Sequence, residues 1–348
     1  MTDPLKAKGN DALRFPFAAA PASGTTVEVA PGVAWLRMPL PFALNHINLW
    51  VLDDGDGWTL VDTGINTPAT QELWAQLIAG PLSSKPVKRL IVTHFHPDHI
   101  GLAGWLVEQH RIPMWITPGE MDAATFLHTT TDIAGPAASK VYERAGVAEA
   151  IPAAMKVHGG GYRERVYALP RDFIAIDPEQ TIAAGGTTWH VVVGEGHSPQ
   201  MAALYSPERK VLISGDQILP GITPNIGVRN SQPNGNPLER FISTLARFRA
   251  LPDDTLVLPS HKLPFYGLHA RVDQLIQHHR DRLAEALAAC ATGATAGDVL
   301  KVLFKRELDP YQFGFALGET VAHLNYLLAD GSVTHTVRPD GVYIYKAA

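Results

Sequence analysis

Thr93-His94-Phe95-His96-Pro97-Asp98-His99 follows the apolar run Arg89-Leu90-Ile91-Val92. A short apolar run rich in β-branched residues is typical of a buried parallel strand, and an α/β sheet places its chemistry at the C-terminal ends of such strands. Side chains alternate along an extended segment, so His94 and His96 point the same way and can hold one cation. Pro97 starts a turn, which lets Asp98 and His99 hold a second cation beside the first.

The alternative interpretation of this stretch is a surface turn that happens to be rich in histidine. Three imidazoles and a carboxylate lie within six residues, 94 to 99, at the end of a predicted strand. Such groups are hard to keep close together without a cation, and this combination of types suits a metal site. The pattern therefore predicts a metal centre.

The H-x-H-x-D-H pattern resembles that of the metallo-β-lactamase superfamily. This resemblance implies a mixed α/β (α+β) fold, a four-layer αββα sandwich with a dinuclear metal site at one edge. Further ligands are then expected after later strands, and the chain supplies three of them: His197, Asp216 and His261. The run Trp58 to Gly64 matches the segment that supports the metal turn. The match covers roughly residues 26 to 265.

The resemblance divides the ligands into two sets and one bridging group. One ion would be held by His94, His96 and His197, the other by Asp98, His99 and His261, with Asp216 between them. Nitrogen and oxygen donors without thiolate suit zinc, and iron or manganese would also accept them. His96 stands where the diiron oxidoreductases of the family have glutamate, so the hydrolytic set is expected.

Asp62, in the supporting segment, is interpreted as a partner that orients one ligand histidine, as metal sites commonly require. A plain acid in the turn after a strand is the alternative. Asp98 is the candidate catalytic residue: it would orient a hydroxide and later carry a proton to the leaving group. Two neighbouring cations lower the pKa of a shared water, which becomes a bridging hydroxide, and polarise the oxygen under attack.

The expected function is therefore a dinuclear metal-dependent hydrolase of a small carbonyl substrate: a thioester, an ester or a lactone. The alternatives are a phosphodiesterase or endoribonuclease whose C-terminal domain binds nucleic acid, a β-lactamase, and a binding protein with a vestigial site. A β-lactamase is disfavoured because those enzymes are usually exported. The complete ligand set argues against the vestigial site. No residue is assigned to substrate binding.

Composition sets the domain prediction. The chain has 348 residues, 46% of them hydrophobic and 18% charged, enough for one large core and a smaller appendage. The predicted domains are an N-terminal arm (1–25), a catalytic domain (26–265) and a C-terminal domain (266–348). A single cysteine, Cys290, excludes an internal disulfide and a cysteine zinc site and fits a reducing compartment.

The N-terminal segment Met1 to Ser23 has no continuous apolar core of signal-peptide length. No later run reaches membrane-spanning length without charge or proline. A cytoplasmic, soluble protein without a membrane partner is expected. The formal net charge of −5 gives no overall attraction to nucleic acid.

Residues 119–170 interrupt the alternation of strands and helices and are predicted to be a helical insertion. This insertion would either be a lid over the site or pack elsewhere on the protein. The tail after Gly267 predicts three helices and a hairpin, an order that resembles a winged-helix module. No lysine or arginine occurs from Glu307 to Val337, whereas phosphate contact needs cations. The tail is therefore predicted to be a packing element, or a homodimerisation element, that closes one side of the site.

Overall fold

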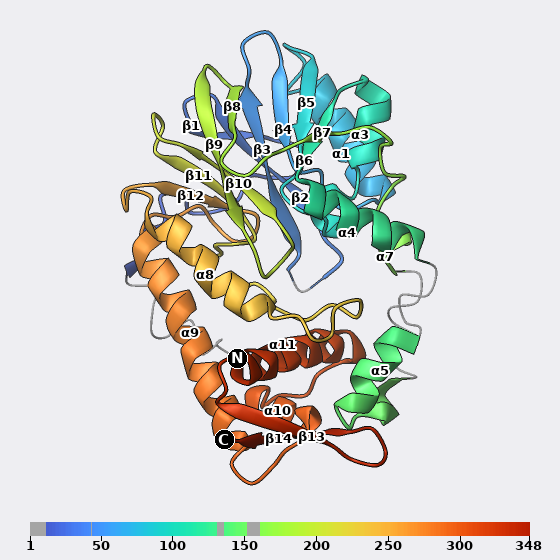
Figure 1. The fold of residues 1–348 in the computed structure, drawn as a ribbon. Helices are drawn as coiled ribbons and strands as arrows, with labels where there is room; N and C mark the ends of the chain where they lie inside the picture. The colour runs from blue at the N-terminus through green and yellow to red at the C-terminus, as the bar shows by residue number, and fades with distance from the viewer. Residues whose placement is uncertain (1–11, 43, 131–135, 152–160) are drawn as a thin grey trace. The chain divides into compact units, whose positions relative to one another are not determined.

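The computed structural model describes residues 12–42, 44–130, 136–151 and 161–348 (Figure 1). Contacts between residues divide the chain into two units. The first consists of residues 1–129, 162–224 and 245–272, and the second of 130–161, 225–244 and 273–348. These units interleave along the chain, whereas the predicted domains are continuous segments. The predicted insertion is shared between the units, and its role as a lid stays a prediction.

The first unit contains a sheet of seven strands in sequence order. The strands are β1 (Val27–Ala30), β2 (Val33–Pro39), β3 (His46–Asp53), β4 (Trp58–Val61), β5 (Val87–Ile91), β6 (Met114–Ile116) and β7 (Ile174–Ala175). The first four pair antiparallel, each strand with the next one in the chain. From β4 to β7 the pairing is parallel, because longer segments that include helices separate these strands.

A second sheet of five strands belongs to the same unit. Its strands are β8 (Thr181–Ala184), β9 (Thr187–Gly194), β10 (Met201–Ser206), β11 (Val211–Gly215) and β12 (Leu256–Pro259), and β11 and β12 are its parallel pair. The sequence pattern does not predict strand β10. All six of its residues are buried, so it has no alternation of apolar and polar side chains to reveal it.

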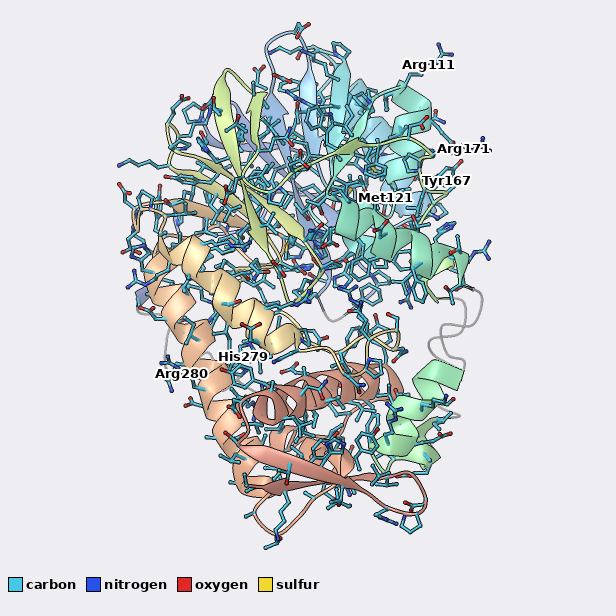
Figure 2. The ribbon with its side chains drawn as sticks, viewed as in Figure 1. Arg111, Met121, Tyr167, Arg171, His279 and Arg280 are labelled. Carbon is cyan, nitrogen blue, oxygen red and sulfur yellow. The ribbon has the colours of Figure 1, made fainter. Side chains whose placement is uncertain are left out.

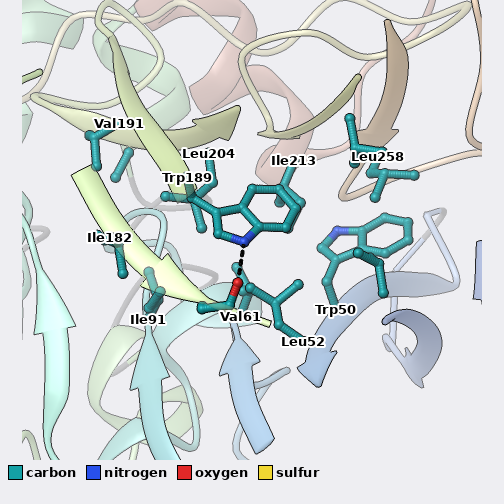
Figure 3. Packing of buried hydrophobic residues seen from close by; sticks show 14 of the residues in the cluster. Trp50, Leu52, Val61, Ile91, Ile182, Trp189, Val191, Leu204, Ile213 and Leu258 are labelled. Carbon is teal, nitrogen blue, oxygen red and sulfur yellow. Dashed lines mark hydrogen bonds between the residues drawn. The ribbon is translucent and has the colours of Figure 1, made fainter. Parts of the chain in front are cut away.

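The two sheets enclose a hydrophobic core cluster of the unit (Figure 3). Trp35 and Trp50 come from the first sheet and Trp189 from the second, and each is at most 1% exposed. The indole nitrogen of Trp189 donates a hydrogen bond to the carbonyl of Ala184 (3.2 Å). Large aromatic side chains bury much apolar area, so this layer contributes strongly to folding.

Helices cover the sheets. On the side of the first sheet that faces away from the second lie α1 (Pro68–Ala79) and α3 (Ala103–His110) (Figure 1). Trp74 and Leu77 of α1 are buried, as their helical spacing predicts. Helix α8 (Pro237–Arg249) reaches the second sheet, where Arg247 donates to the carbonyl of Val193 (2.8 Å). The mixed α/β fold predicted from the sequence is confirmed.

The second unit is mainly helical. It contains α5 (Pro136–Arg144), the 3-10 helix η3 (Ala148–Ala150), most of α9 (Leu268–Ala289), α10 (Ala296–Leu303), α11 (Pro310–Ala329) and the hairpin β13 (Val333–Val337) and β14 (Tyr343–Ala347). Helices followed by a hairpin confirm the predicted order of elements, and the winged-helix assignment stays a prediction. Within the predicted insertion, the sequence also favours a helix over residues 147–157. Residues 152–157 lie outside the described residues, and the described part contains η3.

Helix α9 carries His279 (Figure 2), whose Nδ1 lies 3.4 Å from Nε2 of His323 on α11. Both imidazoles are buried within the second unit. None of the helices in the described part of the chain combines the length and the apolar character that crossing a lipid bilayer requires.

Candidate metal centre

The metal turn begins directly after β5. His96 keeps an extended backbone (φ −61°, ψ 146°), and Pro97 begins the short helix α2 (Pro97–Ile100). The chain is thus extended at His96 and helical at Asp98 and His99, as the residue types require. Nε2 of His94 lies 3.0 Å from Nδ1 of His96, so both imidazoles face one point.

The structure brings all seven predicted ligands together in two groups. The first consists of His94, His96, His197 and Asp216, and the second of Asp98, His99 and His261. Within each group the potential donor atoms lie within 4.8 Å of one another. The later ligands come from the ends of strands: His197 follows β9, Asp216 follows β11 and His261 follows β12.

Asp216 reaches both groups. Its Oδ2 lies 3.4 Å from Nε2 of His197 in the first group. Its Oδ1 lies 3.6 Å from Nε2 of His99 and 3.6 Å from Nε2 of His261 in the second. Asp216 therefore has one oxygen near each donor group.

Asp62 contacts the second group through the ring nitrogen of His99 that does not face the site. Its carboxylate accepts hydrogen bonds from the backbone N–H of Thr93 (2.7 Å) and from its hydroxyl (2.8 Å). The same carboxylate lies 2.8 Å from Nδ1 of His99, which leaves Nε2 of that ring for the site. Nδ1 of His261 lies 3.2 Å from the carbonyl of His46 and is oriented in the same way. The contact with His99 favours the orienting interpretation of Asp62 over a plain turn acid.

Protonation in the first group suits cation binding. Burial, followed by the neighbouring imidazoles, lowers the pKa of His94 well below its usual value. Burial, followed by the charge of His197, lowers the pKa of His96 to about 3. Both rings are therefore neutral at physiological pH and offer a lone pair to a cation.

The second group combines acids with basic imidazoles. Burial alone raises the pKa of Asp98, but His99 and His261 outweigh it and lower that pKa to about 2. Burial alone lowers the pKa of His99, but Asp62, Asp98 and Asp216 raise it well above its usual value. A cation would replace the imidazole protons as the partner of these carboxylates, so binding is expected to release protons.

Two buried atoms show that the residues fit a cation. Nε2 of His99 and Oδ1 of Asp216 are buried and have no hydrogen-bond partner among the described residues. A buried polar atom without a partner is costly, and coordination would satisfy both. The donors are all nitrogen and oxygen, as zinc, iron and manganese accept.

Two residues near the site, Glu120 and Tyr162, are not predicted from the sequence to contact the metal turn. Glu120, in the first turn of α4 (Pro118–Thr129), is fully buried and accepts hydrogen bonds from the backbone N–H groups of Phe95 (3.0 Å) and Gln200 (2.6 Å). The hydroxyl of Tyr162, in α7 (Gly161–Arg165), donates to the carbonyl of Phe95 (2.6 Å). The signal available in the sequence for Glu120 is an acid four residues after the end of the apolar strand β6, in the first turn of the following helix.

A fold of two facing sheets with histidine and aspartate donors at one edge defines a metallo-hydrolase. Residues 44–261 match the Metallo-beta-lactamase superfamily, and residues 283–348 match the family described as Metallo-beta-lactamase-like, C-terminal domain. The first match spans more than half of the sequence. The chain belongs to the metallo-β-lactamase superfamily.

Individual relatives agree with this assignment. A solved structure of a beta-lactamase domain protein from Burkholderia ambifaria is 42% identical, with a TM-score of 0.90 over 97% of this chain and 99% of that one. The probable metallo-hydrolase YqjP of Bacillus subtilis is 24% identical over 315 residues, 88% of this chain and 96% of that protein. A linear primary-alkylsulfatase of a Pseudomonas species is 25% identical over 248 residues, 67% of this chain and 44% of that enzyme.

Proposed function

We propose that this metallo-hydrolase binds two divalent cations, zinc first among them, and cleaves a small carbonyl substrate such as a thioester, an ester or a lactone. The observation that carries the proposal is Asp216, whose two oxygens approach the two donor groups at 3.4 and 3.6 Å. The ligands would be the seven residues of the two groups. Two bound cations would supply an activated water and polarise the oxygen of the bond to be cleaved.

Asp98 is the residue best placed to move a proton. Its side chain is 19% exposed, whereas that of Asp216 is 10% exposed and that of His99 is not exposed at all. Asp98 can therefore meet water and substrate while it lies 3.3 Å from Nε2 of His261. A carboxylate in this position accepts a proton from water and returns it to the leaving group.

Charge favours a carbonyl substrate over a nucleic acid. The net charge is −5, and the sequence from Glu307 to Val337, which includes α11, has no lysine or arginine. A nucleic-acid partner would need cations along its phosphates. For the same reason the tail is proposed to be a packing or homodimerisation element.

Alkyl sulfate esters are a second candidate class, because the linear primary-alkylsulfatase matches 67% of this chain. Hydrolysis of a sulfate ester would use the same donor groups and the same proton path through Asp98. The two classes differ in the anion that the site must accommodate.

A substrate panel tests the proposal. Protein of measured zinc content would be assayed with acyl thioesters, aryl esters, lactones, a chromogenic β-lactam, bis-p-nitrophenyl phosphate, single-stranded RNA and a primary alkyl sulfate. Asp98→Asn is the test variant, and Asp122→Asn, exposed on α4, is the matched control. Carbonyl turnover that Asp98→Asn abolishes and Asp122→Asn preserves is the expected result. Turnover of RNA or of the phosphodiester alone would refute the proposal, and turnover of the sulfate alone would select the second candidate.

A further inference from the structure

Phe95 lies between two proposed ligands, His94 and His96, and side chains from outside the turn hold both of its backbone polar groups. Its N–H donates to Oε2 of Glu120 (3.0 Å), and its carbonyl accepts from the hydroxyl of Tyr162 (2.6 Å). Burial, followed by the charge of Glu120, raises the pKa of Tyr162 well above its usual value, so the hydroxyl remains a donor. The peptide groups that direct the two imidazoles are thus fixed on both sides.

Glu120 also holds the loop of the third histidine in the first group. Its Oε1 accepts hydrogen bonds from the hydroxyl of Ser198 (2.6 Å) and from the N–H of Gln200 (2.6 Å). Ser198 directly follows His197 in the chain. One buried carboxylate therefore joins the loops that carry all three histidines of the first group.

A second pair of bonds strengthens this link. The side chain of Gln200 accepts from the N–H of Gly119 (2.9 Å), and the hydroxyl of Thr117 donates to the carbonyl of Gln200 (2.7 Å). Both partners precede Glu120 in the chain, at the junction of β6 and α4. The carboxylate thus has a fixed position relative to the loop that it holds.

We propose that Glu120, assisted by Tyr162, is a positioning residue that sets the spacing of His94, His96 and His197 before a cation arrives. The inference rests on the proposed function, because it concerns the affinity of the first donor group for a metal ion. Hydrogen bonds that a buried carboxylate accepts from several donors fix loop geometry strongly, since each is assisted by the charge. Outer partners of metal ligands typically contribute 10- to 100-fold in metal affinity.

The second donor group depends on other partners. Asp62 orients His99, and the carbonyl of His46 lies against Nδ1 of His261. Loss of the Glu120 carboxylate is therefore expected to weaken one cation site and leave the other unchanged. A merely structural role for Glu120 would weaken both sites together.

The test variant is Glu120→Gln, which keeps the size of the side chain. A glutamine presents one acceptor oxygen and an NH2 group, so the NH2 group must face either the N–H of Phe95 or the pair of donors from Ser198 and Gln200. The matched control is Glu108→Gln, because Glu108 is exposed on α3 and accepts from the hydroxyl of Tyr167 (3.0 Å). Ser198→Ala removes one donor only and preserves the carboxylate.

Zinc affinity, measured by competition with a chromophoric chelator, is the readout and needs no substrate. His261→Ala isolates the first site and His197→Ala the second. Glu120→Gln is expected to lower affinity 10- to 100-fold in the His261→Ala background and to leave it unchanged in the His197→Ala background. Ser198→Ala is expected to give a smaller loss at the first site only, and it carries the test if Glu120→Gln fails to fold.

Equal zinc affinity in Glu120→Gln and in the wild type, or an equal loss at both sites, would overturn the positioning role while the proposed function stands. Wild-type protein that binds no zinc, iron or manganese would refute the proposed function and this inference with it. Glu108→Gln with an affinity loss like that of Glu120→Gln would also overturn it, because the effect would then not depend on the buried carboxylate.

Discussion

Replacing Asp62 with asparagine changes the orientation of one proposed ligand without removing any ligand. The carboxylate accepts from the N–H and the hydroxyl of Thr93 and contacts Nδ1 of His99, with all three distances between 2.7 and 2.8 Å. Asparagine keeps the side-chain shape but has one acceptor oxygen. It also tolerates the left-handed backbone of this position (φ 64°), whereas alanine would add strain of about 1–2 kcal/mol.

The expected loss follows from the tautomer of His99. If the new NH2 group faces Nδ1, that nitrogen must become the acceptor, and the proton moves to Nε2. Nε2 is the buried atom without a hydrogen-bond partner among the described residues, 3.6 Å from Asp216, that a cation would use. Metal affinity at the second site should fall about 10- to 100-fold, which corresponds to roughly 1.4–2.7 kcal/mol.

Chelator competition measures this loss, and urea unfolding of the metal-free protein measures the stability that accompanies it. A lost hydrogen bond to a charged group is expected to lower the free energy of unfolding by about 1.5–3 kcal/mol. Asp56→Asn is the control, because Asp56 forms an exposed ion pair with Lys88. Wild-type zinc affinity in Asp62→Asn would refute the orienting role.

Two further predictions concern stability. Trp189→Ala should lower the free energy of unfolding by about 3–5 kcal/mol in a urea titration, because Trp189 is 1% exposed. Phe126 is 49% exposed, so Phe126→Ala should change that free energy little. Equal effects of the two substitutions would contradict the proposed core. Burial, followed by His323, lowers the pKa of His279 to about 2, and burial lowers the pKa of His323 to about 4, from the usual 6.5. Both rings stay neutral in the folded chain, whereas they take up protons in the unfolded chain once the pH falls below about 6.5. The free energy of unfolding should therefore decrease as the pH falls from 6.5 towards 4, by about 2 kcal/mol per ring at pH 5. Between pH 7 and pH 5, the free energy of unfolding of His279→Leu should decrease less than that of the wild type, and the exposed His190→Gln is the control. An equal decrease in His279→Leu and in the wild type would contradict the prediction.

Much of the site could be predicted because its ligands are of characteristic residue types at a characteristic spacing. His94, His96, Asp98 and His99 form a continuous pattern, and each later ligand follows an apolar run that the structure confirms as a strand. Helices such as α1 and α11 follow from apolar spacing and from capping residues, Thr67 and Asp309, that precede a proline.

Other features depend on contacts between distant segments. Glu120 resembles any acid in the first turn of a helix, where the helix dipole alone would explain it. Its partner Ser198 is 78 residues away in the sequence, and no local pattern indicates that they meet. Strand β10 has no alternation, because both of its faces are buried. The grouping of residues 225–244 with the tail likewise follows from contacts and not from composition.

Strands β6 and β7 are adjacent and parallel, with Trp115 opposite Ile174, although a long excursion separates them in the chain. The excursion therefore leaves the sheet and returns to it at neighbouring positions, and the entropy of closing such a loop depends only weakly on its length. Loop-closure entropy alone should therefore not prevent a chimeric enzyme that carries the corresponding segment of a homologue from folding. The grafted segment would need to retain Glu120 near its beginning and Tyr162 near its end, because these two residues hold Phe95. Between them, the graft would also need to keep the contacts of the excursion with the tail, such as the hydrogen bond from the N–H of Gly297 to the carbonyl of Ala145 (2.8 Å).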